Sequence, residues 1–185
     1  TGHHLSDEFY ASFIGRPTAD CELLLAQFFG ADFPQDQCRV RRRALWQAHI
    51  DAHGVPLKSG VVELLEYLES GVLPKAIATS TGRASALEHL GELAHRFKVI
   101  VTGDEVKRGK PEPDIFLLAA ARLGVAPERC LVLEDSQLGA EAALTAGMSV
   151  IIVPDLVQPS PEIAARAYRV CASLHAVKEL LGAAR

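Results

Sequence analysis

The spacing of hydrophobic residues changes near residue 54 of this chain. Before it, apolar positions such as Leu23, Leu24 and Phe28 are interleaved with polar ones at helical spacing, without the alternation typical of strands. The run His53-Gly54-Val55-Pro56-Leu57 then brings together glycine and proline, which interrupt regular structure. We therefore predict a small α-helical domain over residues 1–53, a hinge, and a second domain over residues 54–185.

The second domain alternates short apolar runs with segments of helical spacing. A helix is predicted from Val61 to Leu68, with Gly71 as its stop. The predicted buried strands are Ala76-Ile77-Ala78, Val99-Ile100-Val101, Cys130-Leu131-Val132-Leu133 and Val150-Ile151-Ile152-Val153. Helical segments separate the later runs, at residues 115–123 and 140–146. This alternation predicts an α/β fold with a Rossmann-like, doubly wound parallel sheet.

Polar residues follow three of the predicted strands. They are Thr79-Ser80-Thr81, Thr102-Gly103-Asp104 and Glu134-Asp135-Ser136. A doubly wound parallel sheet binds its ligand beyond the carboxyl ends of its strands. We therefore expect these three segments to converge on one site.

Composition limits the classes of protein. With 185 residues, of which 49% are hydrophobic, the chain can bury one good core. A formal net charge of -4 argues against a general nucleic-acid binder, which needs a clustered basic surplus. Four cysteines without metal-ligand spacing predict free thiols, and neither a secretory leader nor a spanning apolar run is evident. These features predict a cytoplasmic protein that does not bind membranes.

One lysine stands in an unusually restricted setting. Lys110 lies in the segment Gly109-Lys110-Pro111-Glu112-Pro113-Asp114-Ile115-Phe116, where glycine and proline limit the backbone on both sides and so aim the ammonium group. The adjacent carboxylates Glu134 and Asp135 suit Mg²⁺, which prefers oxygen ligands and shares them with substrate phosphate. Together these residues predict a phosphate site with Mg²⁺. We assign Asp114 instead to capping the helix that starts at Ile115.

Three of these motifs carry a family resemblance. Ala78-Thr79-Ser80, the Lys110 segment and Leu133-Glu134-Asp135-Ser136 resemble motifs two, three and four of the haloacid dehalogenase superfamily, in order and in spacing. The chain looks closest to the branch of β-phosphoglucomutase-like and phosphoglycolate phosphatase-like proteins. The resemblance implies that residues 1–53 are part of a helical cap. It also implies a Mg²⁺-dependent phosphatase acting on a small phosphorylated metabolite such as a sugar phosphate.

The resemblance also implies roles for individual residues. Thr79 would hydrogen-bond a phosphoryl oxygen together with the backbone N–H of Ser80. Lys110 would bridge that oxygen and the nucleophile. Asp135 would bind Mg²⁺, with Glu134 as a second ligand or as its support. Within the segment Ile14-Gly15-Arg16, the residues Gly15 and Arg16 would contact the substrate from the cap.

The chain departs from the family pattern in one respect. The family's nucleophile is an aspartate in a DxDG motif that follows the first strand, and no such motif occurs in these residues. We expect a central strand carrying this motif, and the first cap helix, to lie upstream of Thr1. With that aspartate present, the implied reaction forms an aspartyl-phosphate that water then hydrolyses.

Three alternatives remain open at this point. A phosphosugar mutase shares the same motifs but returns the phosphoryl group to a sugar. A dehalogenase of this superfamily needs no metal, which the acidic pair Glu134-Asp135 disfavours. A non-catalytic relative that keeps only the phosphate pocket would account for the missing aspartate.

Overall fold

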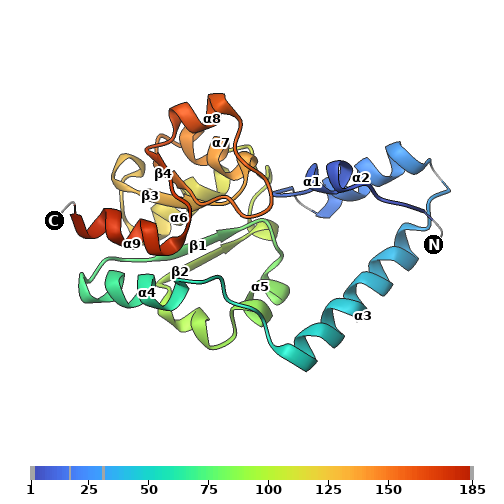
Figure 1. Cartoon of the computed structure of the whole chain (residues 1–185), viewed down its shortest axis with the longest axis horizontal. Coiled ribbons are helices and arrows are strands. Elements are labelled where there is room, and N and C mark those ends of the chain that lie inside the picture. The colour runs from blue at the N-terminus through green and yellow to red at the C-terminus, as the bar shows by residue number, and fades with distance from the viewer. Residues whose placement is uncertain (1–2, 17, 31, 184–185) are drawn as a thin grey trace. The chain divides into compact units, whose positions relative to one another are not determined.

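The computed structural model describes residues 3–16, 18–30 and 32–183, and it divides into two compact units, Thr1–Leu57 and Lys58–Arg185 (Figure 1). Within those ranges no helix is both long enough and apolar enough to cross a membrane. The helix that leads to the boundary ends at His53, and Gly54 follows it with φ 71°. The predicted break in regular structure therefore coincides with the end of this helix.

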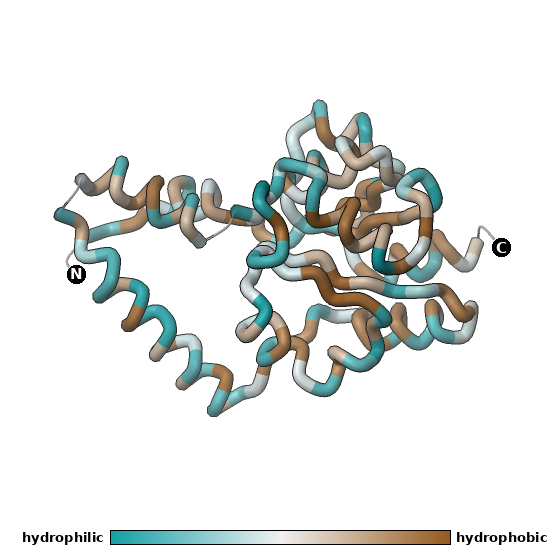
Figure 2. Tube along the Cα trace, turned by 180° about the vertical axis from the view of Figure 1, so that it is seen from behind, coloured by the Kyte–Doolittle hydropathy of each residue, from teal (hydrophilic) through white to brown (hydrophobic). Residues whose placement is uncertain are grey.

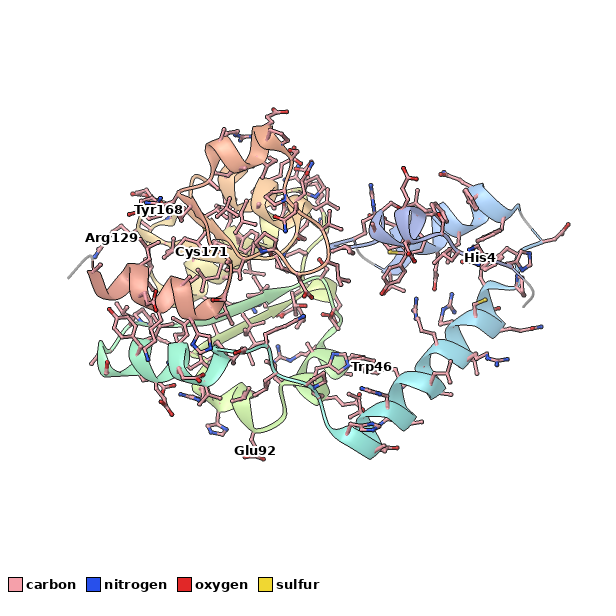
Figure 3. All side chains as sticks on the ribbon, viewed as in Figure 1. His4, Trp46, Glu92, Arg129, Tyr168 and Cys171 are labelled. Carbon is pink, nitrogen blue, oxygen red and sulfur yellow. The ribbon has the colours of Figure 1, made fainter. Side chains whose placement is uncertain are left out.

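The first unit is helical, as the spacing of its apolar residues predicts. Its helices are α1 (Asp7–Ala11), α2 (Thr18–Phe29) and α3 (Gln35–His53). Aromatic rings pack between the chain's first helices and the turn after α2: Phe9 stacks on Phe28 with ring centroids 4.1 Å apart, and Phe29 stacks on Phe33 at 4.9 Å. Trp46 projects from α3 and remains 42% exposed (Figure 3).

The second unit alternates strands with helices, and all its strand pairs are parallel. Its strands are β1 (Ala76–Thr79), β2 (Val99–Thr102), β3 (Leu131–Glu134), β4 (Ser149–Ile152) and β5 (Arg169–Val170). Its α-helices are α4 (Val61–Ser70), α5 (Arg83–Leu90), α6 (Asp114–Leu123), α7 (Gln137–Thr145), α8 (Pro161–Arg166) and α9 (Leu174–Ala183). Short 3-10 helices are η1 (Gly91–Arg96), η2 (Gly103–Glu105) and η3 (Pro127–Arg129).

The predicted strands are confirmed, and Gly71 follows the end of α4 as predicted. The strand β5 escaped prediction because it has two residues, both exposed, and no apolar run marks it. The pairing of the strands also differs from the prediction of one parallel sheet. Among the residues described, the strands form two sheets, β1-β2 and β3-β4-β5, rather than one. Each sheet has its own backbone hydrogen bonds, and the Lys110 side chain contacts both β1 and β3.

Helices cover both faces of the β3-β4-β5 sheet. Along β4, Val150 and Ile152 face a cluster that includes residues of α6, α7 and α8, whereas Ile151 faces a second cluster with residues of α4 and α9. This alternation follows from the two-residue period of a strand. Figure 2 shows the strands as apolar segments flanked by more hydrophilic ones. The structure therefore confirms a doubly wound α/β core.

The four cysteines are free thiols, as predicted. Cys171 lies between β5 and α9 in the second of these clusters, where it is 7% exposed (Figure 3). It acts there as a small hydrophobic side chain.

Candidate phosphate and metal site

The predicted site segments lie at the carboxyl ends of parallel strands. Thr79 is opposite Thr102 at the ends of β1 and β2, and Glu134 is opposite Ile152 at the ends of β3 and β4. Because paired parallel strands end at the same edge, the loops that follow them are neighbours. Lys110 comes from the loop before α6 and reaches the same edge.

Lys110 connects the two sheets. Its Nζ forms an ion pair with Oε1 of Glu134, at the end of β3, and donates a hydrogen bond of 3.4 Å to the carbonyl oxygen of Ala78 in β1. The ammonium also lies 4.9 Å from the centroid of the Phe116 ring. Lys110 is 8% exposed, so these contacts hold a cation inside the protein at the strand ends. A cation held this way can balance the charge of a phosphoryl group.

Both carboxylate oxygens of Glu134 have protein donors. Oε2 accepts hydrogen bonds from the Ser136 hydroxyl at 3.0 Å and from the Ser136 backbone N–H at 3.3 Å. The Ser136 hydroxyl in turn accepts from the Gly139 N–H at 3.0 Å, so it also caps α7. A Cβ on Gly139 would lie 2.1 Å from the carboxyl carbon of Glu134. The absence of a side chain at Gly139 therefore makes room for the buried glutamate.

Asp135 differs from its neighbour in being exposed. Its pKa is raised, first because surrounding protein atoms displace water from the carboxyl group, and second because the Glu134 carboxylate lies nearby. A carboxylate that is crowded by a second negative charge gains from a nearby cation. Mg²⁺ is commonly held by one or two carboxylates, with water and substrate phosphate completing its shell. The chemistry of these carboxylates therefore fits Mg²⁺, and the role of Asp135 as its ligand stays a prediction.

Thr79 ends β1 with its hydroxyl already oriented. Its Oγ1 accepts a hydrogen bond of 3.2 Å from the backbone N–H of Thr81, which leaves the hydroxyl hydrogen to donate. Ser80 and Thr81 lead into Gly82, the N-cap of α5, with the N-terminal end of that helix close behind. Backbone N–H groups at a helix N-terminus favour anions. The turn thus offers donors suited to a phosphoryl oxygen.

The structure brings Thr79, Ser80, Lys110, Glu134 and Asp135 to the strand ends of the second unit. The other two predicted residues belong to the first unit. Gly15 has φ 82°, and Nε of Arg16 donates to the Ser12 carbonyl at 2.8 Å. Their contact with a substrate stays a prediction.

The predicted capping role of Asp114 is wrong. Pro113 occupies the N-cap of α6, and no side chain caps it. Asp114 is the first residue of the helix, where both its oxygens bind Arg108, at 3.2 Å from Nε and 2.9 Å from Nη2. This paired contact with a guanidinium engages both carboxylate oxygens of Asp114.

Sequence reasoning passed over Ser136, Gly139 and Asp104 as individual contributors. Ser136 is the N-cap of α7, which begins at Gln137, whereas the helix predicted from the sequence covers only residues 140–146. A serine directly before the observed start of the helix is the signal that could have extended that prediction. Gly139 leaves room for the Glu134 side chain, which comes from the end of β3. No sequence pattern signals this role.

Comparisons with known proteins agree with this geometry. A phosphorylated carbohydrates phosphatase of Thermotoga maritima is 49% identical over 94 residues, which are 50% of this chain and 44% of that protein. A HAD family hydrolase from Deinococcus radiodurans, solved with bound phosphate and sodium, has TM-score 0.74 and 31% identity, covering 99% of this chain and 83% of that chain. A putative β-phosphoglucomutase from Thermotoga maritima has TM-score 0.74 and 28% identity, covering 100% and 86%.

The sequence profile of one family covers most of the chain. Residues 2–153 match it, a stretch that includes the β1 turn, Lys110 and the Glu134-Asp135 pair. The order of these motifs, their position at the strand ends and the parallel α/β core agree with that match. The chain belongs to the haloacid dehalogenase-like hydrolases.

Proposed function

We propose that this protein is a Mg²⁺-dependent phosphatase that hydrolyses a small phosphorylated metabolite, with a sugar phosphate as the substrate class. The observation that carries the proposal is the position of Lys110, which pairs with Glu134 and bonds to β1 one residue before Thr79. A buried cation therefore lies beside a turn of hydrogen-bond donors. The name of the Thermotoga maritima relative, a phosphorylated carbohydrates phosphatase, supports the substrate class.

The residues of this chain bind and orient the phosphoryl group. The Thr79 hydroxyl and the Ser80 N–H donate to its oxygens, and Lys110 balances their charge. Asp135 holds Mg²⁺, which supplies charge stabilisation to the transferring phosphoryl group. Glu134 holds Lys110 through their ion pair, and Ser136 in turn holds Glu134 by donating to its other carboxylate oxygen.

We place the attacking aspartate of the family on a strand between β1 and β3. Two findings support this position. The residues described show β1 paired with β2, and β3 paired with β4, without pairing between β1 and β3. Lys110 also bonds to both of these strand ends, so a carboxylate arriving between them would meet its ammonium group. The phosphoryl group would pass from substrate to this aspartate and then to water.

Phosphate release by the full-length protein tests the proposal. Hydrolysis of p-nitrophenyl phosphate and of a panel of hexose and pentose phosphates should require Mg²⁺ and stop with EDTA. Lys110→Met should lower kcat by about 100-fold or more, as expected when one charge-stabilising group is lost. Lys107→Met, at an exposed lysine of the same loop, should retain activity. Equal loss in both variants would contradict the role of Lys110.

A phosphosugar mutase is the second candidate, because the fold is shared with a putative β-phosphoglucomutase. The two activities differ in where the phosphoryl group goes. Following glucose 1-phosphate by ³¹P NMR separates them: a phosphatase yields inorganic phosphate, whereas a mutase yields glucose 6-phosphate without net release. Isomer formation as the main product would replace the phosphatase proposal.

A further inference from the structure

The turn after β2 is in direct contact with the turn after β1. The Gly103 N–H donates to the Thr81 carbonyl oxygen at 3.1 Å. A Cβ on Gly103 would lie 2.3 Å from the Ser80 carbonyl oxygen, closer than real Cβ contacts come. Glycine at this position therefore lets the two backbones touch beside the candidate phosphoryl-binding turn.

Asp104 reinforces this contact with both carboxylate oxygens. Oδ2 accepts a hydrogen bond of 3.1 Å from the backbone N–H of Arg83, the first residue of α5. Oδ1 accepts one of 2.5 Å from the hydroxyl of Thr102, which is fully buried at the end of β2. One side chain thus ties the start of α5 to the end of the neighbouring strand.

The neighbouring Glu105 fixes the short helix that carries Asp104. Oε1 of Glu105 lies 3.0 Å from both the backbone nitrogen and the hydroxyl oxygen of Thr102. Oε2 of Glu105 pairs with Arg122 of α6 at 2.6 Å. The short helix η2 is therefore fixed to the strand before it and to α6. The pKa of Asp104 is lowered, chiefly by the Thr102 hydroxyl and then by the Arg83 N–H, so its carboxylate is ionised at neutral pH.

The segment that Asp104 holds is short. The turn from Thr79 to Gly82 is fixed at its start by β1 and at its end by α5, so the position of Arg83 N–H sets where the turn ends. In between, Thr81 bonds to the Thr79 hydroxyl through its N–H and to Gly103 through its carbonyl oxygen. A shift of Arg83 therefore moves the groups that face the phosphoryl oxygens.

We propose that Asp104 is a positioning residue, which holds the turn Thr79–Gly82 in the geometry that binds a phosphoryl group. Its effect on catalysis rests on the proposed phosphatase function. Asp104 acts through the Arg83 N–H and the Thr102 hydroxyl, without touching the substrate. A misplacement of donors by about 1 Å costs about 100-fold in rate, so a residue that sets their position affects kcat more than KM.

Two measurements on the full-length protein test this role. The first is the rate of p-nitrophenyl phosphate hydrolysis with Mg²⁺, and the second is amide hydrogen exchange by NMR at Thr81, Arg83 and Gly103. Asp104→Ala should lower kcat by about 10–100-fold and speed exchange at these amides, with β3 amides unchanged. Asp104→Asn keeps one accepting oxygen and should recover part of both losses.

Two controls separate positioning from general stability. Glu69→Ala removes an ion-paired carboxylate of the same unit, bonded to Arg96 and Lys75, and should leave kcat unchanged. In a Thr79→Val background, Asp104→Ala should cost less than it does alone, because the two act on the same turn. Additive losses, or a kcat for Asp104→Ala within about twofold of wild type, would overturn the proposal.

The two proposals fail in different ways. Absence of hydrolysis by the wild-type protein would remove the phosphatase proposal. The positioning role would then be judged by exchange alone: faster exchange at Thr81 and Arg83 in Asp104→Ala supports it, and unchanged exchange overturns it.

Discussion

Lys110 and Glu134 form a buried ion pair in which each side chain is 7% exposed. Removing one partner of such a pair leaves a charge without water or a counter-ion, at a cost of about 3–5 kcal/mol. The same pair places a cation at the edge where β1 and β3 end. Mutation can separate what the Lys110–Glu134 pair contributes to folding stability from what it contributes to phosphate binding.

We predict that Lys110→Met lowers the free energy of unfolding by about 3–5 kcal/mol, because Glu134 is left buried and unpaired. The double variant Lys110→Met with Glu134→Gln should recover much of this loss. Glutamine carries no charge, and its amide oxygen can take the place of the Glu134 Oε2 that accepts from Ser136. Urea unfolding of both variants measures the difference. A double variant that is no more stable than Lys110→Met would show that the pair is not the source of the cost.

Gly139→Ala tests the space that Glu134 occupies. Alanine normally stabilises a helix by about 0.5–1 kcal/mol relative to glycine. Here the added Cβ would lie 2.2 Å from Oε2 of Glu134, so we predict lower stability and lower phosphatase activity. Gly182→Ala is the matched control, since Gly182 lies in α9 and a Cβ added there would meet nothing within 4 Å. It should be neutral or slightly stabilising in thermal unfolding.

Asp135→Asn should separate metal binding from folding. The charge of Asp135 is disfavoured by displaced water and by Glu134, as its raised pKa indicates. In EDTA we therefore expect the variant to unfold at the same or a higher Tm than wild type. Added MgCl₂ should raise the Tm of wild type, because a ligand that binds only the folded state stabilises it, and leave the variant unchanged. Equal Mg²⁺ response in both would remove Asp135 as the ligand.

Glu69 should contribute to acid sensitivity. Hydrogen bonds from Arg96 and then Lys75 lower its pKa from 4.5 to about 2, so the ionised form is favoured in the folded state. A lowered pKa adds stability above the unfolded value, and that stability is lost as the pH falls from 4.5 toward 2. The Tm difference between wild type and Glu69→Gln should shrink over this range. Glu92→Gln, at an exposed position on η1 (Figure 3), should show a smaller difference.

Local sequence was sufficient for strands β1 to β4, for several of the helices around them and for the edge where the site lies, but not for β5, α8 or α9. The strands β1, β2, β3 and β4 come from short continuous apolar runs, whereas the helices between them have apolar residues at helical spacing. Both patterns can be recognised from neighbouring residues alone. Because parallel strands deliver their following loops to one edge, the grouping of Thr79, Lys110 and Asp135 could be predicted without coordinates.

The tertiary structure decided which partner each polar side chain has. Glu134 and Asp135 are adjacent and chemically alike, yet Glu134 is buried between Lys110 and Ser136, whereas Asp135 is an exposed residue whose carboxyl group is only partly screened from water. Asp114 binds Arg108 instead of capping its helix, and Asp104 reaches the start of α5. The contacts of Glu134 with Lys110 and of Asp104 with Arg83 join residues 24 and 21 positions apart, so they depend on how separate elements pack. Periodicity and motif spacing indicate which segments form helices and strands. The packing of those elements determines which charged side chains pair with one another.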